Sequence, residues 1–154
     1  MNQYTEKLTI GRKDKVDFPK LKLFNIDAKV DTGAYTTSIH CSTIDLVKEN
    51  SKKYVRFKLL DSTHPKYQKK IFKLPVYKEK TVKNSFGESE HRFLVKTKIR
   101  LFGKDNEIEL SLTNREKMTY PVLIGRKLLS KNFIVDVNRY NLSYRQKRKN
   151  KEKK

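Results

Sequence analysis

The chain has 154 residues, and 37 lysines and arginines against 17 aspartates and glutamates give it a formal net charge of +20. Hydrophobic residues make up 36% of the sequence, which is enough for one domain with a hydrophobic core. No apolar run is long enough to span a membrane, and the N-terminal residues lack the pattern of a secretory signal. We therefore expect a soluble, cytoplasmic protein with no membrane partner.

The first half of the chain contains several short segments that are typical of strands. They cover residues 7–10, 23–30, 54–60 and 71–76, and the polar segment 61–70 is typical of a loop. Cys41 is the only cysteine, so the chain forms no internal disulfide, and a zinc site built on two cysteines of one chain is excluded. This cysteine content fits a reducing compartment.

The second half contains the clearest two-residue periodicity. Phe93, Val95, Thr97, Ile99 and Leu101 alternate with basic residues, which predicts a half-buried strand. Turn residues at 103–106 and a second alternation at 108–112 predict that this strand forms a β-hairpin with the next. A further strand is expected at 133–137 and a short helix at 125–131. Together these elements predict an all-β barrel or sandwich.

The C-terminal end is the most basic part of the sequence. Residues 145–154 contain seven basic residues and one acidic residue, and we interpret 143–154 as a disordered basic tail beyond a domain at 1–142. The excess positive charge would attract polyanions such as nucleic acid, ribosomes or an acidic peptide. Lysines scattered along the rest of the chain are equally typical of a solvated surface.

The segment Asp31-Thr32-Gly33-Ala34 is the first candidate for chemistry. A predicted strand leads directly into it, and the small Gly33 and Ala34 allow backbone N–H groups to approach the carboxylate of Asp31. Taken alone, Asp-Thr-Gly is also an ordinary turn. The second candidate is Ile124-Gly125-Arg126, where a short apolar strand enters the predicted helix. Taken alone, this segment is typical of a core strand followed by a helix start.

In this order the two segments resemble the retropepsin pattern. The stretch from Asp31 to His40 is similar to the Asp-Thr-Gly-Ala-x-Thr-Ser-x-Leu-His motif of one bacterial branch. Residues 112–118 and 121–126 are similar to the same branch's Leu-Thr-(Asp/Asn)-Arg-x-x-Met and Leu-(Leu/Ile)-Gly-Arg motifs. That branch is often called "ATP-dependent zinc protease", and its members are frequently encoded near an ATP-grasp ligase that adds glutamates to a ribosomal protein. The resemblance runs from about residue 7 to 142.

The resemblance implies a closed retropepsin-like acid-protease barrel with one short helix after the Gly-Arg motif. It implies a homodimer with one catalytic aspartate, Asp31, in each subunit, and Thr32 hydrogen-bonded across the dimer. Gly33 would offer its backbone to Asp31 and the substrate, and the strand around Ile124 and Gly125 would support the turn. A flap hairpin would lie near residues 82–92. Its members would include Phe86, Gly87 and Arg92, although an ordinary surface hairpin fits this segment equally well.

Two features depart from viral retropepsins. Tyr35 stands where those enzymes have an aspartate that pairs with the arginine of Gly-Arg, so Arg126 needs another partner: Asp136, a backbone carbonyl or a substrate carboxylate. The longer spacing between the two motifs implies an insertion around residues 45–70. His40 matches the branch motif and is expected to anchor the turn through a hydrogen bond. The alternative role for His40 is to bind an acidic group of the substrate.

The sequence supports three functional hypotheses. The first is an aspartic endopeptidase that acts on an acidic or glutamate-tailed protein, with Arg92, Arg126 and lysines holding the substrate. The second is a non-catalytic basic module that binds RNA or the ribosome. The third is a zinc hydrolase, but the chain has neither a His-Glu-x-x-His motif nor a phosphate-binding Gly-rich loop, and His40, His64 and His91 are far apart. We therefore expect no metal, zinc or ATP cofactor.

Overall fold

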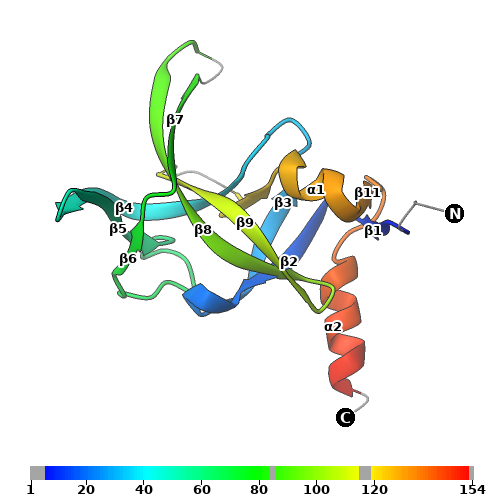
Figure 1. Ribbon diagram of the computed structural model, residues 1–154. Helices are drawn as coiled ribbons and strands as arrows, with labels where there is room; N and C mark the ends of the chain where they lie inside the picture. Colours follow the sequence, from blue (N-terminus) through cyan, green and yellow to red (C-terminus); the bar gives the residue numbers. More distant parts are fainter. Residues whose placement is uncertain (1–5, 84–85, 115–118, 153–154) are drawn as a thin grey trace, which may run out of the picture.

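The computed structural model describes residues 6–83, 86–114 and 119–152, which form mostly β-strands with two α-helices (Figure 1). None of the helices in these ranges is long and apolar enough to cross a membrane. In chain order the elements are β1 (Leu8–Ile10), β2 (Lys13–Phe18), a 3-10 turn (Pro19–Leu21), β3 (Leu23–Val30), β4 (Thr37–Glu49), β5 (Lys52–Leu59), β6 (Phe72–Pro75), β7 (Lys78–Lys83), β8 (Ser89–Leu101), β9 (Lys104–Thr113), β10 (Val122–Ile124), α1 (Arg126–Asn132), β11 (Phe133–Val135) and α2 (Leu142–Glu152).

The strands form one large sheet and one small sheet. In the nine-stranded sheet the order is β10-β3-β2-β8-β9-β4-β5-β6, with β7 paired to β8, while β1 and β11 form a separate parallel pair. The short strand β10 is parallel to β3 and also antiparallel to β4, so the pairings run in a ring. The connection between β2 and β8 rests on a single residue pair, Asp17 and Arg100. The mostly β architecture is therefore confirmed, whereas closure into a barrel stays a prediction.

The core lies between the inner faces of these strands. On β3, Ile26, Ala28 and Val30 are buried while Asp27 and Lys29 alternate with them on the exposed face. On α1, Leu128 and Leu129 pack inward. The burial of these apolar side chains supplies the main driving force for the fold, and it fixes the register that brings the end of β3 beside β10.

Most of the predicted strands are confirmed, and β3 has the expected bounds. The strands β2, β4 and β7 were not predicted from sequence. The strand β4 is 13 residues long, and its first five residues, including Thr37, Ser38 and His40, are all buried. Because this half of β4 is covered on both faces and contains polar residues, it lacks the alternation by which a strand is recognised.

The expected insertion corresponds to a long hairpin and the loop that follows it. The strands β4 and β5 are joined by the two-residue turn Asn50–Ser51, whose φ angles of 50° and 66° are typical of a tight hairpin turn. This hairpin extends from the body of the molecule (Figure 1). The β8–β9 hairpin has the same kind of turn at Phe102 and Gly103, with φ of 53° and 73°. Only Gly103 falls within the turn predicted at 103–106, because β9 already begins at Lys104.

The basic C-terminal segment is helical, and the prediction that it is disordered was wrong for its described part. The first turn of α2 docks on the carboxylate of Asp14, which is buried on β2. Its oxygens accept hydrogen bonds from the backbone N–H groups of Ser143 (2.9 Å) and Tyr144 (3.1 Å). The Ser143 hydroxyl accepts a bond from the N–H of Phe102. The sequence did not reveal this cap because its acceptor lies on a distant strand rather than beside the helix.

We expect Asp14→Ala to lower the free energy of unfolding by about 2 kcal/mol, because the buried N–H groups at the start of α2 lose their acceptor. Urea unfolding measures the stability, and far-UV circular dichroism measures the accompanying loss of helix. The control is Asp27→Ala, which removes an exposed ion pair with Lys15 and should cost no more than about 1 kcal/mol. Equal losses in the two variants would contradict this role for Asp14.

Candidate active site

The turn that follows β3 presents the carboxylate of Asp31. The Asp31 N–H donates to the carbonyl of Ile124 (2.9 Å), and the Asp31 carbonyl accepts from the N–H of Ala34 (3.2 Å). The Gly33 N–H donates to Asp31 Oδ1 at 3.0 Å, which orients the side chain. Asp31 is partly exposed, and Thr32 and Gly33 are exposed. The carboxylate is therefore held in place and open to solvent rather than sealed inside the subunit.

The strand β10 and the start of α1 support this turn from behind. The Gly125 N–H donates to the hydroxyl of Thr37 (3.2 Å), and the Arg126 N–H donates to the carbonyl of Ala34 (2.8 Å). A Cβ atom on Gly125 would lie 2.6 Å from the carbonyl oxygen of Tyr35. The close approach of the two backbones at this point therefore requires a glycine.

The Arg126 side chain finds its partner in the turn itself. Its Nη1 donates to the carbonyl oxygen of Thr32 at 3.1 Å, and its guanidinium lies over the ring of Tyr35, 5.5 Å from the centroid. Of the three partners considered for Arg126, the structure shows a backbone carbonyl. Tyr35 thus replaces the ion pair of viral retropepsins with a cation–π contact.

A second cation lies beside the same tyrosine. Lys80, on β7, donates from Nζ to the hydroxyl of Thr36 (3.2 Å), and Nζ is 5.1 Å from the centroid of the Tyr35 ring. Among the described residues, no carboxylate forms an ion pair with Lys80 or Arg126. The nearby Lys127 differs, because it is paired with Glu109 at 2.9 Å, a hydrogen bond that raises the pKa of Lys127 and lowers the pKa of Glu109.

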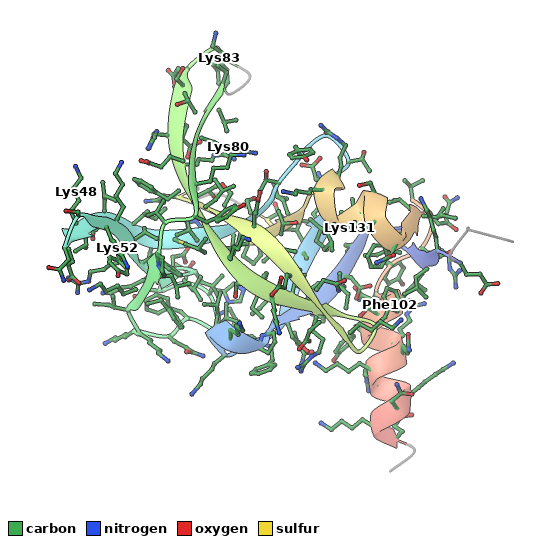
Figure 2. All side chains as sticks on the ribbon, in the orientation of Figure 1. Lys48, Lys52, Lys80, Lys83, Phe102 and Lys131 are labelled. Atoms are coloured by element: carbon green, nitrogen blue, oxygen red, sulfur yellow. The ribbon has the colours of Figure 1, made fainter. Side chains whose placement is uncertain are left out.

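The predicted flap is a hairpin of β7 and β8 that stands out from the body (Figure 1). The side chain of Phe86 is 87% exposed and Gly87 has a φ of +80°, while residues 84 and 85 lie outside the described residues. Figure 2 shows Lys83 near the outer end of the hairpin and Lys80 nearer the body. Arg92 lies directly opposite Lys80 on β8, but it is largely buried and paired with Glu90 (3.1 Å).

His40 lies at the opposite end of β10 from Asp31. It is buried, and its Nε2 is 3.0 Å from Asp61 Oδ2, while its backbone N–H donates to the carbonyl of Pro121. Hydrogen bonds from Thr63, and then from His40, hold the pKa of Asp61 below its usual value. These contacts tie the loop after β5 to β4, so His40 anchors this loop rather than the Asp31 turn that was expected from sequence. A hollow of about 260 Å³ opens here and is lined by His40, Ser42, Asp61, Ser62, Thr63 and Asn114.

The other two histidines have different partners. His91 contacts Glu79 at 2.9 Å, and the ring nitrogen Nδ1 of His64 accepts a bond from the N–H of Lys66. Residues 6–83, 86–114 and 119–152 contain no cluster of three His, Cys, Asp or Glu side chains that would hold a metal ion.

Comparison with known families identifies the family to which the chain belongs. A family model described as the retropepsin-like aspartic endopeptidase RimB matches residues 9–146. The chain belongs to this RimB-like family. The family was the one suspected from the two sequence motifs, and the matched region includes both the Asp31 turn and the Gly125 support.

Relatives and solved structures agree with this assignment. Probable alpha-L-glutamate ligases from Desulfotalea psychrophila and Shewanella pealeana are 34% and 38% identical over 136 and 134 residues, which is 88% and 84% of this chain. The chain spans less than a third of the length of these relatives, 29% and 28%. A crystal structure of a Legionella pneumophila protein of unknown function superposes with a TM-score of 0.69 at 25% identity, covering 88% of this chain and 97% of that one.

The structure brings most of the predicted site residues together. Asp31 to Ala34 and Ile124 to Arg126 form one hydrogen-bonded unit, whereas Phe86 and Gly87 lie out on the hairpin and His40 anchors a separate loop. The sequence analysis missed Lys80, because the strand that carries it was not predicted. The only feature of the sequence that pointed to this site was Tyr35, which stands where viral retropepsins have an aspartate that pairs with the arginine.

We expect Gly125→Ala to destabilise the protein by about 2–3 kcal/mol, because the added methyl group collides with the backbone of Tyr35 and Thr36 rather than with movable side chains. Thermal and urea unfolding measure the effect. The control is Ser130→Ala on the exposed side of α1, which should change stability by less than about 0.5 kcal/mol. A Gly125→Ala variant as stable as the control would show that the two backbones are not constrained here.

Proposed function

We propose that the chain is one subunit of a homodimeric aspartic peptide hydrolase with a retropepsin-like barrel. The observation that carries the proposal is the presentation of Asp31: a partly exposed carboxylate, oriented by the Gly33 N–H at 3.0 Å and fixed to β10 through its own backbone. The match to a family of aspartic endopeptidases supports the same conclusion.

One subunit supplies one carboxylate, so the proposed site needs a second copy of the chain. The exposed strands β1 and β11 offer a surface for this contact. Leu8 is 40% exposed, Ile134 58% and Val137 67%, so a second copy could cover three apolar side chains here. Burial of these side chains between two copies, with the two Asp31 turns facing each other, would complete the site.

The proposed reaction uses the two carboxyl groups as an acid and a base. Two carboxylates held close together share one proton, because their like charges oppose full ionisation. Asp31 in its ionised form takes a proton from a water molecule, whose oxygen attacks the scissile carbonyl carbon. The partner subunit's Asp31 donates its proton to the carbonyl oxygen. Collapse of the resulting diol breaks the C–N bond: Asp31 gives its proton to the leaving nitrogen, and a hydroxyl of the diol returns a proton to the partner subunit's Asp31. Closure of the β7–β8 hairpin, with Phe86 and Gly87 near its end, would exclude bulk water.

We further propose that the substrate is acidic, in the form of a glutamate-tailed protein. Lys80 and Arg126 lie over the Tyr35 ring directly beside the catalytic turn and have no carboxylate partner among the described residues. A glutamate side chain there would receive charge-assisted hydrogen bonds from both groups. The relatives described as probable alpha-L-glutamate ligases support this substrate class. Arg92, paired with Glu90, is less suited to the role than was expected from sequence.

We expect Asp31→Asn to lower the rate of peptide hydrolysis by at least about a hundredfold while leaving the melting temperature unchanged, because the acid–base pair is lost but the turn is kept. Mass spectrometry of a glutamate-tailed peptide measures the cleavage. The control is Asp27→Asn on the exposed face of the same strand, which should retain activity. An Asp31→Asn variant that cleaves as fast as the control would refute the mechanism.

The same variant also tests the dimer. Excess Asp31→Asn chain, mixed with the unmodified chain and allowed to exchange subunits, should inhibit hydrolysis because mixed dimers hold only one aspartate. Sedimentation velocity measures whether dimers form. Activity that stays proportional to the amount of unmodified chain in the mixture would indicate that the site is complete within one subunit.

We expect Lys80→Gln to raise the KM for a glutamate-tailed peptide about tenfold, because one charge-assisted hydrogen bond to the substrate is lost. The kcat should change little, and a peptide with glutamine in place of glutamate should be affected much less. The control is Lys48→Gln, which removes a lysine at the far end of the β4–β5 hairpin (Figure 2). Equal effects on both peptides would show that Lys80 does not select for a carboxylate.

A further inference from the structure

The helix α2 is a rigidly mounted basic element rather than a loose tail. Asp14 caps its first turn, and further along the helix Lys147 binds the carboxylate of Asp17 (2.8 Å) and the side chain of Asn25 (2.7 Å). Two contacts one turn apart fix both the direction and the rotation of the helix. It extends away from the body on the side opposite the β7–β8 hairpin (Figure 1). Its exposed residues at 145–152 therefore have defined positions.

Cations gather around two tyrosines at the base of this helix. Three surround Tyr140: Arg12 at 4.9 Å, Lys13 at 5.3 Å and Arg145 at 4.6 Å from the ring centroid. Two more lie over Tyr144, Lys15 at 5.7 Å and Arg148 at 5.9 Å. We call these seven residues the Tyr140–Tyr144 surface. The surface combines residues from β2 and its approach, the turn before α2, and α2 itself.

Three carboxylates near this surface have partners within the fold, and one of these partners, Lys15, belongs to the surface itself. Asp14 accepts backbone N–H groups, Asp17 binds Lys147, and Asp27 binds Lys15. Among the described residues, Arg12, Lys13, Arg145 and Arg148 form no ion pair. The surface thus carries positive charge that the described part of the chain does not neutralise.

We infer that the Tyr140–Tyr144 surface binds the phosphodiester backbone of a nucleic acid. A guanidinium that lies against a tyrosine ring has already lost part of its conformational entropy before a ligand binds. Its N–H groups remain able to donate hydrogen bonds to phosphate oxygens. A nucleic acid supplies closely spaced phosphates, and neutralising several of them releases counterions. An open hollow of about 540 Å³ beside the surface gives the nucleic-acid strand room to continue. The hollow is lined by Asn25, Tyr144, Lys147, Arg148, Lys151 and Glu152.

The arrangement favours a phosphate backbone over an acidic peptide. Cations lie over both tyrosine rings, although Tyr140 remains 38% exposed, so the surface offers mainly positive charge and N–H donors. The helical part of the surface lies on the opposite side of the body from the β7–β8 hairpin that carries Lys80 (Figure 1). We therefore expect binding to persist in Asp31→Asn.

The experiment measures binding of fluorescein-labelled single-stranded RNA and DNA of about 20 nucleotides by anisotropy at several salt concentrations. We expect Arg145→Gln with Arg148→Gln to weaken binding at least about tenfold at low salt. The slope of log K against log salt should become shallower by about 1.4, which corresponds to two phosphates of a single strand. The control double variant, Lys48→Gln with Lys52→Gln, loses the same charge from the β4–β5 hairpin (Figure 2) and should bind nearly as well as the unmodified chain.

A second variant separates binding from the integrity of the helix. Arg12→Gln with Lys13→Gln alters the same surface from outside α2 and should weaken binding to a similar extent, with unchanged helix content. Equal affinities for RNA and DNA would support recognition of the phosphodiester backbone alone. Tighter binding of RNA would support RNA as the natural ligand. Two outcomes would overturn the inference: control and surface variants that bind alike, or a poly-glutamate peptide whose binding depends on Arg145 and Arg148 as strongly as that of the nucleic acids.

Discussion

The close backbone contact between β10 and the two strands beside it is the constraint on which the site depends. The strand β10 is short, yet it pairs with β3 on one side and with β4 on the other, and Asp31 and Ala34 bond to residues at its end. This geometry leaves no space for a side chain at Gly125. The position of Asp31 is therefore set by main-chain hydrogen bonds, which move less than side chains do, and a catalytic carboxylate benefits from that rigidity.

The replacement of an acidic residue by Tyr35 changes the electrostatics beside this rigid turn. An aspartate there would neutralise Arg126, whereas a tyrosine keeps the guanidinium in place through its ring and leaves the charge available. Lys80 approaches the same ring from the hairpin strand and adds a second positive charge. Tyr35, which departs from the pattern of viral retropepsins, thus gives the acidic substrate proposed above a physical basis.

The sequence predicted the parts of the molecule that depend on local pattern. The alternation of β3 and β8, the turn at Asp31 and the glycine at 125 were all recognisable because each is a short-range requirement of the backbone. The parts that were missed depend on distant partners. The first half of β4 is buried on both faces, Lys80 meets Tyr35 across many residues, and the first turn of α2 is capped by Asp14 from another strand.

The helix α2 shows why composition alone misleads at the C-terminal end. A run of lysines and arginines repels itself and carries little apolar surface to bury, which is why disorder was expected. Here the unfavourable charge is offset at the base of the helix, where Asp14 holds the N-terminal N–H groups and Asp17 binds Lys147. Because these acidic groups act within the fold, the basic residues farther along form no ion pair among the described residues. Part of the positive charge of the protein is thus held in ordered positions, where a polyanion can meet several cations at once.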